Sequence, residues 1–242
     1  MTMARNKFAF LATGVVLAMA LTLSCSNDGG SSGNENSSSS ENNQGGNPDS
    51  SGNGGNSSSS VGCSVSAVSE NSVTYGDQTY RTVKICEQVW FAENLNYEVS
   101  GSICYDNEPE NCDKYGRLYD WETALTVCPS GWHLPDTTEW NVLIDFAGGY
   151  PTAGAKLKAE NGWKDNGNGT DQYGFSAMPG GNKHSFNDYF EYVGNIGFWW
   201  GASENEDYKA YAHYWRINYN LKQVYKGNEF KESSLSVRCI KD

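Results

Sequence analysis

A tract of small polar residues limits where this chain can fold. Of the 35 residues from Ser26 to Ser60, 29 are Ser, Gly or Asn, and none is aromatic or branched apolar. Such a segment cannot bury enough apolar surface to offset the entropy lost on ordering, so we expect it to stay disordered. As a flexible coil it would span roughly 30 Å, with a maximum reach of about 120 Å. Packing is therefore expected only after residue 60.

The segment before this tract has the features of an export signal. Arg5 and Lys7 precede an apolar run of 16 residues, Phe8 to Leu23, which is shorter than the roughly 20 residues of a membrane-spanning helix. Leu21-Thr22-Leu23-Ser24 before Cys25 resembles the lipobox of bacterial lipoproteins, although Thr22 stands where Leu is usual. The resemblance implies that residues 1–24 are a removed signal peptide and that Cys25 carries a diacylglycerol group. An ordinary cleaved signal peptide and an uncleaved anchor are the alternatives.

A lipidated Cys25 would make residues 25–60 a tether. One acyl chain binds a membrane marginally, whereas several anchor a protein stably. Ser26 follows the cysteine, in place of the Asp that commonly signals inner-membrane retention in lipoproteins. We therefore expect an outer-membrane lipoprotein whose folded part faces the cell surface or the periplasm.

Residues 61–242 differ abruptly in composition and are expected to form one domain. They contain all eight Trp residues of the chain, enough for a substantial core. The whole chain has a net charge of −12 and no stripe of Lys and Arg. These features disfavour nucleic acid and anionic lipid surfaces as partners of the domain.

The remaining cysteines indicate disulfide bonds. Six cysteines follow Cys25, and an even number in an exported domain is typical of a disulfide framework whose connectivity stays open. The turn-rich segment between Cys104 and Cys112 favours a local bridge. We expect the other two pairs to be Cys63–Cys86, around the first predicted strands, and Cys128–Cys239.

The hydrophobic pattern predicts an α+β domain. Residues 80–86 and 88–91 alternate as a strand pair, residues 211–219 alternate as a strand, and a final strand is expected over 235–240. Residues 118–127 have a helical composition. Asp136 is expected to cap a second helix, with Glu139 as its reciprocal partner. The predicted architecture is two helices on a twisted antiparallel sheet with long loops.

An ordered series of motifs resembles one protein family, the Fibrobacter succinogenes major paralogous domain. The resemblance covers roughly residues 65–242. It implies a cell-surface or secreted lipoprotein and a C-type-lectin-like fold shared with relatives of the formylglycine-generating enzyme. Cys86 departs from the family pattern, in which Gly is common at that position. The motifs are VKI…QVWFAENLNY from Val83, YGRLYDW from Tyr115, CPSGWHLP from Cys128, GFSAMPGG from Gly174, FWWGASE from Phe198 and SVRC from Ser236.

No residue pattern points to catalysis, and we expect a domain without catalytic activity. The formylglycine-generating relatives use a pair of reactive cysteines near the C-terminus, whereas this chain offers only Cys239 there. His133, His184 and His213 lack an adjoining nucleophile motif. Glu204, Glu206 and Asp207 are interpreted as a solvated acidic loop rather than as a glycosidase carboxylate pair.

One loop could hold calcium. Asp165, Asn166, Asn168 and Asp171 supply the oxygen atoms that a hard cation prefers, but Gly167 and the missing closing Glu depart from the EF-hand pattern. A plain Asn/Gly turn is the alternative. We expect no other cofactor.

Dense aromatic residues in the last third of the chain are the remaining functional clue. Trp215, the Trp132/Trp140 pair and either Trp199 or Trp200 are expected in the core. Tyr208 and Tyr214 lie off the expected inner face, where rings could stack on sugars. The expected function is adhesion to polysaccharide by a non-catalytic, surface-tethered module. The alternatives are a structural or protein-binding component of the envelope and, third, an enzyme related to the formylglycine-generating oxidases.

Overall fold

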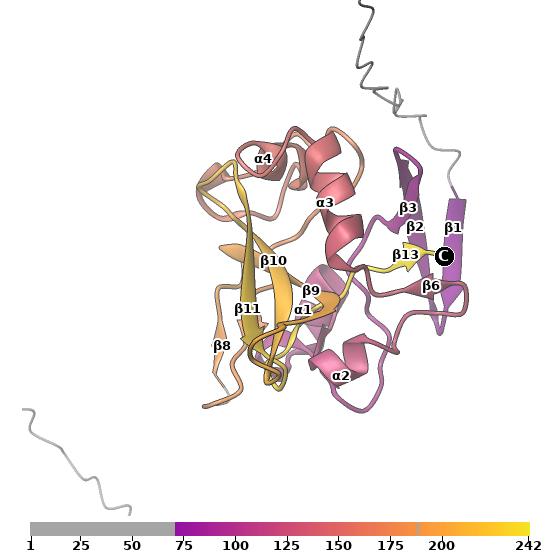
Figure 1. Cartoon of the computed structure of the whole chain (residues 1–242). Helices are drawn as coiled ribbons and strands as arrows, with labels where there is room; N and C mark the ends of the chain where they lie inside the picture. The colour runs from indigo at the N-terminus through magenta and orange to yellow at the C-terminus, as the bar shows by residue number, and fades with distance from the viewer. Residues whose placement is uncertain (1–70, 188) are drawn as a thin grey trace, which may run out of the picture. The chain divides into compact units, whose positions relative to one another are not determined.

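The computed structural model of the chain describes residues 71–187 and 189–242 (Figure 1). They form a mixed fold of short helices and curled, mainly antiparallel sheets, which confirms the mixed α/β class. The predicted signal peptide, Cys25, the tether and Cys63 lie outside the described residues. None of the described helices is long and apolar enough to cross a membrane.

The first sheet joins the beginning and the end of the described chain. Its strand order is β1-β2-β3-β13-β6, and all its pairs are antiparallel. The predicted strand pair is confirmed as the β2–β3 hairpin. The bounds are β1 Asn71–Tyr75, β2 Gln78–Ile85, β3 Gln88–Phe91, β6 Trp132–His133 and β13 Ile240–Lys241.

The second sheet contains the longest strands. Its order is β11-β10-β9-β12-β5-β4, and only β12 pairs in parallel, through Ser236 and Trp199. A separate two-stranded ribbon pairs β7 with β8. The bounds are β4 Ser102–Ile103, β5 Leu118–Tyr119, β7 Asn182–Lys183, β8 Phe190–Glu191, β9 Ile196–Glu204, β10 Tyr211–Asn218, β11 Val224–Phe230 and β12 Leu235–Ser236.

The described residues form four α-helices, where the sequence predicted two. They are α1 Pro109–Tyr115, α2 Trp121–Ala124, α3 Thr137–Phe146 and α4 Ala153–Leu157, with 3-10 turns at Tyr105–Asn107 and Lys164–Asn166. The predicted capping box of α3 is confirmed: the Asp136 carboxylate accepts from the Glu139 amide at 2.9 Å, and the Glu139 carboxylate accepts from the Asp136 amide at 2.9 Å.

The helix predicted over residues 118–127 is wrong. Leu118 and Tyr119 instead form β5 and pair with β12 and β4, and α2 is a single turn. Asp120 caps that turn by accepting a hydrogen bond from the Thr123 amide at 2.8 Å. Tertiary strand pairing outweighs helix propensity here, as it commonly does for short segments.

The predicted final strand divides between two sheets. Leu235 and Ser236 belong to the second sheet, and Ile240 belongs to the first. Between them, the carbonyl groups of Val237 and Cys239 accept hydrogen bonds from the amides of Leu95 and Phe91, both at 2.9 Å. This connecting segment therefore joins the two sheets.

Two apolar clusters fill the interior. In the first, Trp140 of α3 stacks on Trp215 of β10, with ring centroids 5.1 Å apart, and packs on Trp90 of β3. Figure 1 accordingly shows α3 between the β2–β3 hairpin and the long strands β9 to β11. The second cluster contains Trp200, Trp121 and Val237. The predicted burial of Trp140 and Trp215 is confirmed, and both Trp199 and Trp200 are buried, where the sequence predicted one of the two. Trp132, also predicted in the core, is half-buried.

Candidate functional site

Two of the three predicted disulfides are confirmed. Cys104 is bonded to Cys112, and Cys128 to Cys239 with Cα atoms 5.9 Å apart. Cys86 is also disulfide-bonded, but its predicted partner Cys63 lies outside the described residues. None of these five cysteines offers the thiolate that a catalytic cysteine needs.

A buried arginine links three segments of the chain. The Arg238 guanidinium of the SVRC motif is 0 % exposed and donates to the carbonyl oxygen of Phe91 at 2.9 Å and to Asn94 Oδ1 at 2.9 Å. It also donates to the Phe175 carbonyl. Burial lowers the pKa of Arg238 to about 9, so the group is still charged at neutral pH. Its position in the interior gives it a structural role.

Two of the four residues predicted to bind calcium, Asn168 and Asp171, accept hydrogen bonds from nearby residues of the chain. Asn168 Oδ1 accepts from the Trp163 amide at 3.1 Å. The Asp171 carboxylate accepts from the Ser176 amide at 2.7 Å and from its hydroxyl at 2.6 Å. Asp165 and Asn166 are exposed and have left-handed backbone conformations. Over the described part of the chain, no group of three or more His, Cys, Asp or Glu side chains is arranged to hold a metal.

The three histidines lie in separate environments. His133 bridges Glu139 and Asp242, and His213 Nδ1 lies 2.6 Å from Asn228 Oδ1. Glu204, the first residue of the predicted acidic loop, forms ion pairs with Lys209 at 3.3 Å and, more closely, with Lys231. Hydrogen bonds from Lys231 and Lys209 lower the pKa of Glu204, which suits a structural ion pair.

Tyr208 and Tyr214 do not lie in one cluster. Tyr214 is half-buried against the second core, where its ring contacts Phe198 at 5.6 Å. Tyr208 is 67 % exposed and contacts Tyr211.

Tyr208 belongs to a connected row of four rings at one end of β10 and β11, which we call the aromatic ladder. The ladder consists of Phe186, Phe230, Tyr211 and Tyr208, with successive centroid distances of 4.6, 4.2 and 6.3 Å. Phe186 at one end is 70 % exposed. The ring planes are tilted relative to one another, so the surface is contoured rather than flat. Sequence reasoning missed Phe186 and Phe230 because residues far apart in the sequence meet only in the fold.

Hydrogen bonds to the backbone fix the chain at both ends of the ladder. Asn205 Oδ1 accepts from the amides of Asp207 and Tyr208 at 3.0 and 2.8 Å, which fixes the turn that carries Tyr208. At the other end, Lys183 and Ser234 exchange backbone hydrogen bonds of 3.0 and 2.9 Å just before Phe186. Rings held in this way lose little conformational entropy on binding.

An ion pair lies near the same strand ends as the ladder. Lys231, which follows Phe230, pairs with Glu204, the last residue of β9. The Lys231 ammonium also lies 4.2 Å from the ring centroid of Trp121, which belongs to the second apolar cluster.

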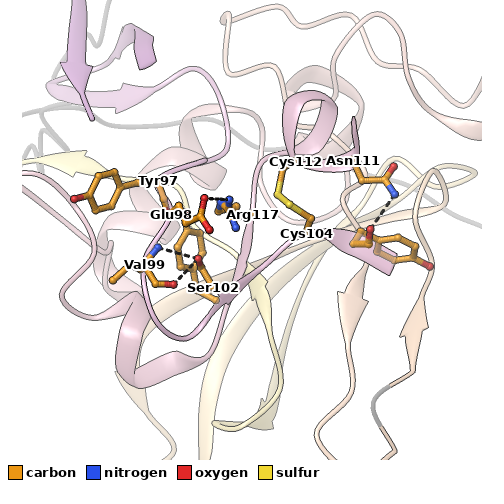
Figure 2. The surroundings of a disulfide bond; sticks show 10 residues. Tyr97, Glu98, Val99, Ser102, Cys104, Asn111, Cys112 and Arg117 are labelled. Atoms are coloured by element: carbon orange, nitrogen blue, oxygen red, sulfur yellow. Dashed lines mark hydrogen bonds and ion pairs between the residues drawn. A yellow bond between two sulfur atoms is a disulfide. The ribbon is translucent and has the colours of Figure 1, made fainter. Parts of the chain in front are cut away.

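Two polar hollows lie beside the Cys104–Cys112 disulfide, with volumes of about 530 and 650 Å³. Both are lined by Gln78, Asn96, Cys112 and Asp113, so they adjoin, and we call the pair the disulfide groove. Figure 2 shows part of its wall, where Glu98 and Arg117 form an ion pair of 2.7 Å between Tyr97 and the disulfide.

A comparison with known protein families matches residues 83–241 to the Fibrobacter succinogenes major domain. The chain belongs to this family. No curated protein and no solved structure matches the chain. The Fibrobacter succinogenes major domain of this chain includes the aromatic ladder, Arg238 and both confirmed disulfides. The β1–β2 turn, which contributes Gln78 to the disulfide groove, precedes the matched residues.

Proposed function

We propose that this family domain is a non-catalytic module that adheres to polysaccharide, tethered to the outer membrane by a lipid on Cys25. The observation that carries the proposal is the aromatic ladder, whose exposed rings at both ends are joined through partly buried ones. The CH faces of sugar rings stack on aromatic rings. The same proposal includes a C-type-lectin-like fold for the domain.

The electrostatics agree with an uncharged ligand of this kind. Lys231, the cation that follows Phe230 in the chain, is engaged by Glu204 and by the face of Trp121. The chain is acidic overall, which disfavours anionic ligands through long-range repulsion. Neutral plant cell-wall glycans are therefore the favoured class.

The test is retention of purified full-length protein on insoluble cellulose, xylan and mannan. We expect Tyr208→Ala and Phe186→Ala to weaken retention by about 1–3 kcal/mol each, as expected for aromatic hot-spot residues that stack on the ligand. Tyr225→Ala is the matched control, since Tyr225 is an exposed tyrosine on β11 whose ring contacts Arg216 rather than a ladder ring.

Three outcomes would count against the proposal. These are equal retention of all variants, loss of retention in the Tyr225 control, and capture of an envelope protein with no retention on any glycan. The last result would favour the protein-binding alternative. Repeating the assay with a calcium chelator tests the predicted calcium loop, because a calcium-dependent module would lose retention.

A further inference from the structure

The disulfide groove has the features of a second binding surface. One wall is the β1–β2 turn with Asp77 and Gln78, and the opposite wall is α1 with Asp113. The Cys104–Cys112 disulfide ties α1 to the segment that follows β4. The wall that α1 forms is therefore covalently fixed.

The charges in the groove disfavour an anion. Two of its three cations are neutralised, since Arg81 pairs with Glu93 at 2.8 Å and Arg117 with Glu98 at 2.7 Å. The third, Lys114, lies with its ammonium 4.7 Å from the Tyr115 ring centroid. The carboxylates of Asp77, Asp113 and Glu160 line the groove without a hydrogen bond or ion pair to another described residue. A carboxylate or phosphate ligand would meet this excess negative charge.

The neutral groups in the groove offer both donors and acceptors. The side-chain amides of Gln78, Asn96 and Asn161 line it and make no hydrogen bond within the described structure. A hydroxyl group can satisfy either kind of atom, because it donates and accepts.

An aromatic pair stands at one end of the groove. The rings of Tyr75 and Tyr97 stack with centroids 4.1 Å apart. Gly76 has φ of +61°, and a Cβ there would lie 2.9 Å from a ring carbon of Tyr97. The tight turn thus packs directly on the ring and holds it in place.

From these features we propose that the disulfide groove binds a single neutral polysaccharide chain through its hydroxyl groups. The proposal rests on the polysaccharide-binding function above and deepens it, since it names uncharged glycan as the ligand class. In this proposal the aromatic ladder contacts the surface of an insoluble polysaccharide, and the disulfide groove holds a single polysaccharide chain.

The test is calorimetric titration of full-length protein with soluble probes. The neutral probes are cellohexaose, xylohexaose and mannohexaose, the anionic probe is oligogalacturonate, and the cationic probe is hexalysine. We expect at least one neutral probe to bind and the galacturonate not to bind. Gln78→Ala should weaken that binding by about tenfold, the equivalent of one lost hydrogen bond at a desolvated site.

A substitution at Asp113 tests the effect of charge on binding separately from the effect of hydrogen bonding. Asp113→Asn keeps a polar group of the same shape, so we expect it to retain the neutral probe within about threefold and to raise the affinity for oligogalacturonate. Gln172→Ala and Asp145→Asn, at exposed positions outside the groove, are the matched controls. Thermal unfolding of each variant checks that the fold is intact.

The outcomes distinguish the two proposals. Retention on insoluble glycan without binding of any soluble neutral probe, or with binding unchanged in Gln78→Ala, overturns the groove proposal and leaves the adhesive function standing. Preferred binding of hexalysine also overturns it, because the groove would then be a site for basic peptide. Failure of both assays overturns both proposals.

Discussion

His133 Nε2 lies 2.9 Å from Glu139 Oε1, while its Nδ1 lies 2.7 Å from Asp242 Oδ1. One imidazole therefore connects the capping box of α3 to the residue after β13. Burial by itself lowers the pKa of His133, but hydrogen bonds to Asp242 and Glu139 outweigh burial and raise it.

The raised pKa predicts a pH-dependent contribution to stability. A histidine whose folded pKa exceeds its unfolded value contributes fully below the unfolded pKa, about 6.5, and loses that contribution as the pH rises through the folded pKa. We expect His133→Gln to cost more at pH 5.5 than at pH 8.5, by less than about 1 kcal/mol because the ring is partly exposed. Urea unfolding at both pH values measures the difference. His213→Gln is the control, since its partner is the neutral Asn228 amide, and an equal cost of His133→Gln at both pH values would contradict the assignment.

The two described disulfides should differ in their effect on stability. Cys128–Cys239 joins residues 111 apart in the sequence, whereas Cys104–Cys112 joins residues 8 apart. Because closing a longer loop removes more entropy from the unfolded chain, we expect replacing Cys128 and Cys239 by Ala to cost about 2–5 kcal/mol and the local pair to cost less. Chemical denaturation of the two double variants tests the order, and the reverse order would show that native-state strain dominates.

Arg238 and Asn94 are expected to act as one unit. Asn94 Oδ1 accepts from Arg238 at 2.9 Å and from Trp199 Nε1 at 2.8 Å, and both polar residues are buried. Asn94→Ala leaves the guanidinium with one acceptor fewer, and Arg238→Met leaves the Phe91 and Phe175 carbonyls without this donor. We expect each change to cost about 3 kcal/mol or more. A double-mutant cycle should give a coupling energy above about 0.5 kcal/mol, and additive losses would refute the coupling.

Trp215 and Tyr208 provide a contrast between core and surface. Trp215 is 0 % exposed and stacks on Trp140, so Trp215→Ala should destabilise the fold by about 3–5 kcal/mol. Tyr208→Ala should change the free energy of unfolding by no more than about 0.5 kcal/mol, as is usual at exposed positions. Thermal unfolding of both variants compares them. A large loss for Tyr208→Ala would mean that the ladder serves stability rather than binding.

Local chemistry in the sequence predicted several features correctly. Asp136 and Glu139 stand three residues apart, so the capping box needs no distant partner, and the β2–β3 hairpin depends on neighbouring strands. The helix predicted over residues 118–127 is wrong because that segment depends on distant partners. Its first two residues pair with strands formed near residues 102 and 235, and a composition-based reading cannot detect such pairing.

The candidate sites also combine local features, which the sequence predicts, with features that need distant contacts. The mixed fold class, the family, the burial of Trp140 and Trp215 and the local Cys104–Cys112 bridge were all predictable from the sequence, because burial follows composition and short-range geometry follows spacing. The contact network that joins Phe186 to Tyr208 in one ladder, and the position of the β1–β2 turn opposite α1 across the disulfide groove, became visible in the folded chain alone. Those contacts join residues that are distant in the chain, and their positions are set by the packing of two sheets around α3 rather than by any local pattern.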